Sequence, residues 1–228
     1  MHKRYVFLDT ETTGLSPHTG HKIVEIAMLE VVDNKETGKF LHHYINPEMS
    51  MPKEAFNVHG ISDELLSDKL KICDVIQEVR DFIGDDKIVA HNATFDVNFL
   101  NYEFSNHNLN TISDSNIIDT LKIAKSKYPN NKNNLDSLAN RLNVSLEERK
   151  EYHGALVDTK ILYQVYRKMQ VSQSKLIADD LNRQDSYIVN NSNLCRNLNI
   201  SDRSNHYRDN DTLIKYNEFL AKYSLKDW

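Results

Sequence analysis

The chain has 228 residues, which is enough for one globular domain of about 150–200 residues with an appendage. Its formal net charge of −5 argues against a broad basic surface that would bind duplex DNA through many phosphates. An apolar fraction of 39% and a mean hydropathy of −0.60 predict that part of the chain packs poorly.

The cysteines and the N-terminal sequence indicate in which cellular compartment the protein is located. Cys73 and Cys195 are the only cysteines and lack metal-ligand spacing, so a disulfide framework is not expected and a reducing cytoplasm is favoured. The N-terminal apolar run is broken by Asp9, and no later segment approaches about 18 apolar residues. We therefore expect a cytoplasmic protein with no signal peptide and no membrane partner.

The predicted elements begin with strands. Residues 4–9 are read as a central strand, and 23–32 and 38–45 as a hairpin or a meander, because β-branched and aromatic residues concentrate there. A short helix opens at 52–56, with Pro52 suited to its first turn. The later elements are a second short helix capped by Ser62 and Asp63, a helix at 74–83, a strand at 88–92, a helix at 94–104, a strand at 115–120 with Asp119 capping the next helix, and helices at 134–142 and 153–169. This order predicts an α/β fold with a mixed central sheet flanked by helices.

The composition changes near residue 171. Residues 1–172 are expected to form the folded domain, and residues 173–208, with few aliphatic side chains between 182 and 208, a flexible linker. Residues 209–228 recover a helical pattern with an apolar stripe formed by Leu213, Tyr216, Leu220 and Tyr223. The tail as a whole is expected to be weakly ordered.

Two carboxylates close the first strand, in the stretch FLDTETTGL. Asp9 and Glu11 are two residues apart and project from the same face if the strand continues that far. Carboxylates on one face suit a hard divalent cation such as Mg²⁺ or Mn²⁺. The alternative is a strand end that carries two solvated acids.

Further candidates lie later in the chain. Asp96 follows a strand end in HNATFD, and His153 lies five residues before Asp158 in HGALVD. Alone, each has a structural explanation: Asp96 as an acid favoured by the helix dipole, and His153 as an ordinary histidine near a helix cap.

Together, DTET, HNATFD and HGALVD resemble the signatures Asp-x-Glu, Asn-x-x-Phe-Asp and His-x-x-x-x-Asp of the DEDDh 3′→5′ exonucleases. The segments EAFNVHGISDE and NLDSLANRL extend the resemblance, over about residues 3–170, to the epsilon (proofreading) subunits of bacterial DNA polymerase III. The resemblance implies a ribonuclease H-like exonuclease fold. It also implies hydrolysis of the 3′-terminal phosphodiester of single-stranded or frayed DNA, which releases nucleoside monophosphates.

The resemblance assigns roles to these residues. Asp9, Glu11 and Asp158 are expected to bind two divalent cations, Mg²⁺ or Mn²⁺, at the substrate phosphate, and Asp96 completes the acidic set. His153 is the expected general base, since a histidine is available in its neutral form at cellular pH. The cations would compensate the clustered negative charge.

The resemblance also implies a wall around the terminal nucleotide. Glu54 is expected at the 3′ hydroxyl or sugar, and Val58 and His59 at the base and sugar. Phe95 is read either as a stacking residue or as a core residue. Gly14 either lets backbone amides approach a nucleotide or is a plain turn glycine.

Partners follow from the same family. Its C-terminal segment docks on the polymerase subunit, which makes residues 209–228 the candidate docking helix. QSKLIA (173–178) has the spacing of a sliding-clamp motif but ends in Ala178, so a plain helix end is the alternative. Two other functions stay open: a free-standing DEDDh exonuclease acting on RNA or DNA ends, and a non-catalytic subunit that stabilises the polymerase. The tail favours the replicase, and the intact set of acids argues against the scaffold.

Other conspicuous polar residues are given structural interpretations. His42 and His43 lie on adjacent faces of a strand and cannot both face one site. Asp85 and Asp86 are read as a solvated turn.

Overall fold

The structure, a computed structural model, describes residues 3–147 and 153–170. The expected linker, clamp motif and docking helix lie outside the described residues. No helix in the described part of the chain combines the length and apolar character needed to cross a membrane.

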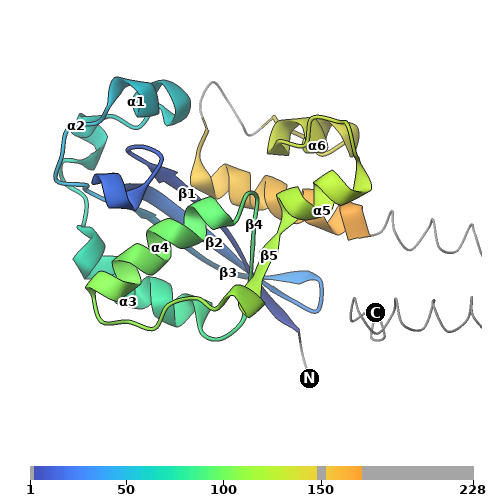
Figure 1. Cartoon of the computed structure of the whole chain (residues 1–228), viewed down its shortest axis with the longest axis horizontal. Coiled ribbons are helices and arrows are strands. Elements are labelled where there is room, and N and C mark those ends of the chain that lie inside the picture. The colour runs from blue at the N-terminus through green and yellow to red at the C-terminus, as the bar shows by residue number, and fades with distance from the viewer. Residues whose placement is uncertain (1–2, 148–152, 171–228) are drawn as a thin grey trace, which may run out of the picture. The chain divides into compact units, whose positions relative to one another are not determined.

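A mixed sheet of five strands forms the centre, in the order β3-β2-β1-β4-β5 (Figure 1). The central strand β1 (Arg4–Thr12) pairs antiparallel with β2 (Ile23–Val32) and parallel with β4 (Lys87–Ala90). At the two edges, β3 (Lys35–Tyr44) pairs antiparallel with β2, and β5 (Ile117–Asp119) runs parallel to β4. The predicted mixed α/β sheet is confirmed, with β1 longer than expected.

The predicted hairpin between β2 and β3 is also confirmed. Asp33 and Asn34 form its turn with φ angles of 50° and 62°. Positive φ at both turn residues matches the twist of the flanking strands, and Asn and Asp tolerate it. Because the turn is this short, β3 begins at Lys35, three residues before the expected start at residue 38.

The helices begin close to their expected positions. Their bounds are α1 (Lys53–His59), α2 (Asp63–Leu66), α3 (Ile72–Ile83), α4 (Thr94–Asn106), α5 (Thr120–Lys127), α6 (Leu135–Arg141) and a helix over residues 155–170, with 3-10 turns at Pro17–Thr19 and Asp114–Asn116. Ser62 and Asp119 cap α2 and α5 as predicted, because each side chain accepts hydrogen bonds from amides of the first turn. Pro52 lies at the N-cap of α1 and not inside its first turn.

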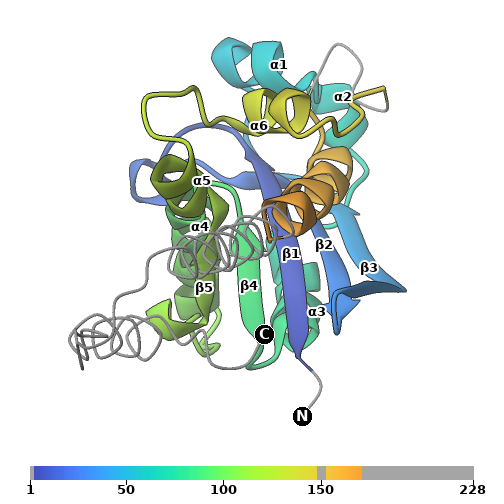
Figure 2. The ribbon, with the colours of Figure 1, turned by 90° about the vertical axis from the view of Figure 1, so that its right-hand side faces the viewer.

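Helices cover both faces of the sheet (Figures 1 and 2). Val6 and Leu8 belong to a buried cluster that includes side chains of α3 and α4, whereas Tyr5 and Phe7 belong to a second cluster with α5, α6 and the helix over 155–170. In that second cluster the ring of Phe7 packs edge-on against Tyr163, at 5.2 Å between centroids. Burial on both faces explains why residues 5–8 of β1 form a continuous apolar run.

The amino-terminal end of β1 carries a paired charge cluster. Arg4 donates through Nε to Glu30 Oε1 (2.6 Å) and through Nη1 to Asp86 Oδ2 (2.7 Å). It also donates to the backbone carbonyls of Phe82 and Ile83. Asp85 and Asp86 lie in a turn, and Asp85 is exposed as predicted. Asp86, whose side chain is 41% exposed, also joins a partly buried network that ties the end of α3 to β1 and β2.

Candidate active site

The first two candidate residues lie at the carboxyl end of β1. The strand extends to Thr12, so Asp9 and Glu11 project from the same face, as their spacing predicts for a continuing strand. Across the antiparallel pair, Asp9 lies opposite Ala27 and Glu11 opposite Glu25. The strand end thus presents two carboxylates side by side, with a third acid on the neighbouring strand.

Asp96 approaches from α4, which follows β4, the parallel neighbour of β1. It lies in the first turn of α4, is 3% exposed, and its Oδ1 accepts a 2.7 Å hydrogen bond from Thr10 Oγ1. Burial raises the pKa of Asp96 to about 7, and the hydrogen bond from Thr10 opposes this rise. The topology therefore brings Asp96 to β1 although 86 residues separate it from Thr10.

His153 and Asp158 come from the start of the helix over residues 155–170. His153 Nδ1 lies 3.4 Å from Asp158 Oδ2, and the side chain of His153 is 45% exposed whereas that of Asp158 is 6% exposed. Glu11, His153 and Asp158 each offer a ligand atom, and these atoms lie within 4.8 Å of one another. The structure thus brings the two ends of the domain together at one candidate metal site.

The electrostatics of this site fit a divalent cation. Burial raises the pKa of Asp9 well above its usual range, and the nearby charges of Asp96, Glu11, Asp158 and Glu25 raise it further. Carboxylate oxygens are the ligands that Mg²⁺ and Mn²⁺ prefer, and a cation among them would lower their mutual repulsion. The residues present therefore suit the expected metal site.

The carboxyl end of α1 lies beside His153. The backbone N–H of His153 donates to the carbonyl of Val58 (3.3 Å), and Val58 is 52% exposed. His59 is only 4% exposed; its Nδ1 accepts from the N–H of Ile61, and burial lowers its pKa. Glu54 is exposed in the first turn of α1. Contact of these residues with a nucleotide stays a prediction.

Two other expected contact residues have structural neighbours. A Cβ atom on Gly14 would lie 2.3 Å from Cε1 of His21, so the ring of His21 occupies the space that a side chain would need. This is a physical reason for glycine that neither interpretation of the sequence anticipated. Phe95 is partly buried, packs against the core and lies 5.2 Å from the ring of Phe99.

Glu25 was not among the site residues predicted from the sequence. This residue is 1% exposed in β2; its Oε1 lies 2.7 Å from His42 Nε2, and its Oε2 accepts from the N–H of Ala155 (3.0 Å). His43 contacts Glu78 instead, which confirms that the two histidines serve different faces. An acid between apolar residues of a strand was the available signal, because such a group needs buried partners.

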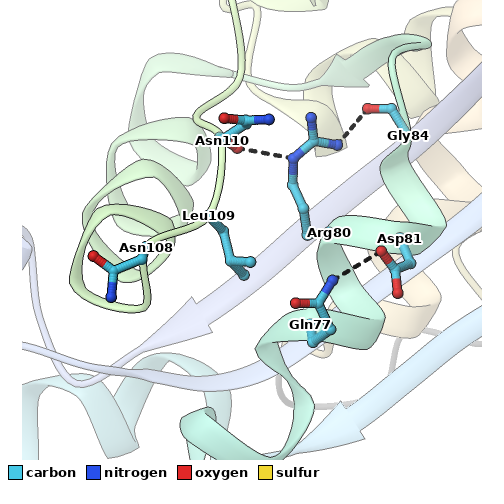
Figure 3. A pocket seen from close by; sticks show the side chains of 7 residues that line it. All are labelled: Gln77, Arg80, Asp81, Gly84, Asn108, Leu109 and Asn110. Atoms are coloured by element: carbon cyan, nitrogen blue, oxygen red, sulfur yellow. Dashed lines mark hydrogen bonds between the residues drawn. The ribbon is translucent and has the colours of Figure 1, made fainter.

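The structure also contains a groove of about 390 Å³, drawn in Figure 3, whose lining includes none of the candidate site residues. It is lined by Gln77, Arg80, Asp81, Gly84, Asn108, Leu109 and Asn110. Gly84 lies shortly before β4, which begins at Lys87 and runs parallel to β1. The groove therefore lies toward the amino-terminal ends of these strands, away from the carboxyl end of β1. The Arg80 guanidinium donates to the carbonyls of Asn110 and Gly84, which closes part of the groove with the protein's own hydrogen bonds.

Comparison with known proteins agrees with this geometry. The exonuclease (RNase T) family model matches residues 6–166. A DNA polymerase III subunit epsilon from Rickettsia felis is 46% identical over 166 residues, which cover 72% of each chain. Another from Haemophilus influenzae is 40% identical over 183 residues, which cover 78% of this chain and 71% of the relative.

Solved exonuclease structures have the same fold. Exonuclease X in complex with 5′-overhanging duplex DNA superposes with a TM-score of 0.59 at 26% identity, over 75% of this chain and 93% of that one. Escherichia coli exonuclease I with a dA16 oligonucleotide gives a TM-score of 0.68 at 16% identity, over 76% of this chain and 42% of that one. The ribonuclease H-like exonuclease fold is thereby confirmed, and the chain belongs to the exonuclease family, in the group of the DNA polymerase III epsilon subunits.

Proposed function

We propose that this protein is the 3′→5′ proofreading exonuclease of a bacterial replicative DNA polymerase. It would hydrolyse the 3′-terminal phosphodiester of a single-stranded or frayed DNA end and release nucleoside monophosphates. The observation that carries the proposal is the meeting of Glu11, His153 and Asp158, with ligand atoms within 4.8 Å, beside the partly buried Asp9.

The carboxylates are suited to hold the metal. Asp9, Glu11 and Asp158 would bind two divalent cations, Mg²⁺ or Mn²⁺, and the charge of Asp96 completes the acidic set. Bound divalent cations offset the negative charge of the phosphate and make water a stronger nucleophile near neutral pH.

His153 would accept the proton of the attacking water. Its half-exposed side chain is open to solvent, and its Nδ1 faces the carboxylate of Asp158 at 3.4 Å. A carboxylate in this place stabilises the imidazolium that forms when the ring takes up the proton, and it orients the ring. His153 and Asp158 already lie close enough for these two roles, so neither side chain has to move far.

The nucleotide would lie against the end of α1. Val58 offers exposed apolar surface next to His153, and Glu54 lies one helical turn earlier with an exposed carboxylate. Phe95, partly buried in α4, would support the base. Such contacts tolerate any base, so selection of mismatched ends would come from how often a frayed end reaches the site.

The decisive assay uses DNA labelled at its 5′ end, with Mg²⁺ and with EDTA. We expect a ladder of shortened products with Mg²⁺, none with EDTA, and none from an Asp9→Asn, Glu11→Gln double variant. Equal or better degradation of an RNA strand would favour the free-standing exonuclease. Absence of degradation of both strands would favour the non-catalytic subunit.

The polymerase partner is tested separately. The relatives named above are subunits of DNA polymerase III, and residues 209–228 carry the apolar stripe expected of a docking helix. A chain that ends at Ser172 should keep nuclease activity and lose co-elution with the polymerase subunit. With the full chain, addition of polymerase should increase removal of a mismatched primer terminus over a matched one; unchanged co-elution after truncation would contradict the docking role.

A further inference from the structure

Glu25 is a buried carboxylate that the proposed chemistry does not use. It lies in β2, is 1% exposed, and its Cα pairs with that of Glu11 across the sheet. Burying a carboxylate among apolar side chains is unfavourable unless the group is hydrogen-bonded. Its partners therefore indicate what it does.

One partner is the start of a helix. Glu25 Oε2 accepts a 3.0 Å hydrogen bond from the N–H of Ala155, the first residue of the helix over 155–170. Amides in the first turn have no acceptor within their own helix, so a group outside the helix must supply one, and here it is a side chain. Here the acceptor comes from a strand 130 residues earlier in the chain. On its other side, Glu25 Oε1 lies 2.7 Å from His42 Nε2, which fixes the carboxylate in this orientation.

The helix start that Glu25 holds carries two candidate site residues. His153 lies two residues before Ala155, and Asp158 three residues after it. The N–H of His153 donates to the Val58 carbonyl (3.3 Å), so the chain is held on both sides of Gly154. The Glu25 carboxylate also lies beside Gly154, since a Cβ atom on this glycine would be at ordinary contact distance, 4.0 Å, from Oε2.

We propose that Glu25 is a positioning residue. Its hydrogen bond to Ala155 sets the place where the helix begins, and thereby holds His153 beside Glu11 and Asp158. This inference rests on the proposed function, in which His153 takes a proton from water. Small displacements of a catalytic group lower the rate far more than they lower substrate binding.

Two substitutions distinguish the effect of the length of the Glu25 side chain, its reach, from the effect of its charge. Glu25→Gln keeps an oxygen that can accept from Ala155 and loses the charge, whereas Glu25→Asp keeps the charge and shortens the side chain by one methylene. If reach matters, Glu25→Gln should stay within about 3-fold of the wild-type kcat, and Glu25→Asp and Glu25→Ala should lose about 10- to 100-fold with little change in KM.

Glu30→Ala is the matched control. Glu30 is a second buried glutamate of β2, 6% exposed, but it pairs with Arg4 at the other end of the sheet. This variant should lose stability and keep its kcat. Equal kcat in Glu25→Ala and Glu30→Ala would overturn the proposal, and so would a Glu25→Gln variant as slow as Glu25→Asp or slower, because charge would then matter more than position.

A third measurement does not depend on activity. Amide hydrogen exchange at Ala155 in the metal-free protein should be slow in the wild type, Glu25→Gln and Glu30→Ala, and fast in Glu25→Asp and Glu25→Ala. Unchanged exchange in Glu25→Asp and Glu25→Ala would overturn the positioning bond even if the wild type degrades no nucleic acid. An inactive wild type whose Ala155 exchange changes as expected would instead refute the nuclease and keep the bond.

Coupling to His153 completes the test. In a His153→Ala background, Glu25→Ala should lower the residual rate by less than about 3-fold, because the group it positions is already gone. A loss as large as in the wild-type background would show that Glu25 acts through some other residue.

Discussion

Carboxylates lie at both ends of β1, and the surrounding residues shift their pKa values in opposite directions. At the amino end, the hydrogen bond from Arg4 lowers the pKa of Glu30. At the carboxyl end, burial and neighbouring carboxylates raise the pKa of Asp9 well above its usual range. The first set balances its own charge and stabilises the fold, whereas the second keeps excess negative charge that only an added cation would balance.

The largest effect is expected from His153→Ala at the carboxyl end. Loss of a general base lowers kcat by about 10²- to 10⁴-fold, and a half-exposed ring contributes little to folding stability. Degradation of a labelled single strand measures the rate, with His43→Ala, which contacts Glu78, as the control. Near-normal turnover of His153→Ala would rule out its assigned role.

The next effect sharpens the contrast in charge balance. Burial raises the pKa of Asp96 to about 7 from 3.8, so the metal-free native state binds a proton that the unfolded chain has released between these values. Stability should therefore fall as the pH rises from about 4 to about 7. Asp96→Asn removes this ionisation and should stabilise the metal-free protein near pH ~8, by on the order of 1–4 kcal/mol.

Urea unfolding in EDTA near pH ~5 and near pH ~8 measures this difference. The advantage of Asp96→Asn should shrink at the lower pH, and added Mg²⁺ should reverse it, since the cation stabilises the wild-type site. A variant less stable than wild type at the higher pH in EDTA would contradict an electrostatic penalty at this end of the strand.

At the opposite end, Arg4→Met should destabilise the protein. Glu30 would remain buried with only the exposed Lys39, 3.7 Å away, as a cation, and partial exposure of Arg4 limits the loss to about 1–3 kcal/mol. Since the pKa of Glu30 is lowered from 4.5, its contribution is present above that value and lost as the pH falls through the lowered pKa. Thermal unfolding near pH ~7 and near pH ~3 tests this, and kcat of the folded variant should not change.

The smallest effect concerns Thr10→Val, a change of similar shape. It removes the 2.7 Å hydrogen bond that lowers the pKa of Asp96, so that pKa should rise by about half a unit to one unit. The pH range over which the metal-free protein loses stability in EDTA should move to higher pH by the same amount. An unshifted range would mean that Asp96 does not titrate there in the metal-free native state.

Much of this arrangement could be read from the sequence because it depends on local rules. The alternation of side chains on a strand placed Asp9 and Glu11 on one face once β1 reached Thr12. Capping chemistry located the starts of α2 and α5 at Ser62 and Asp119. The roles of the catalytic and nucleotide-contact residues came from the family resemblance and stay predictions.

The pairing partners could not be predicted in the same way. Glu25 meets Ala155 and Glu30 meets Arg4 only after strands and helices have packed, and their sequence separations are 130 and 26 residues. The space beside Gly14 is filled by His21, which no turn rule indicates. Such contacts depend on tertiary packing, so the sequence signals a need for a partner without identifying it.

The helix over residues 155–170 has a consequence for synthesis on the ribosome. Asp158 in this helix and His153, two residues before its start, both belong to the candidate site, and Tyr163 packs against Phe7 on the central strand. A nascent chain that has been synthesised as far as α6 already contains all five strands but still lacks His153 and Asp158. We therefore expect nuclease activity to arise late in translation, after residues 153–170 have left the exit tunnel and packed on the sheet. Shorter nascent chains should then not degrade nearby nucleic acid.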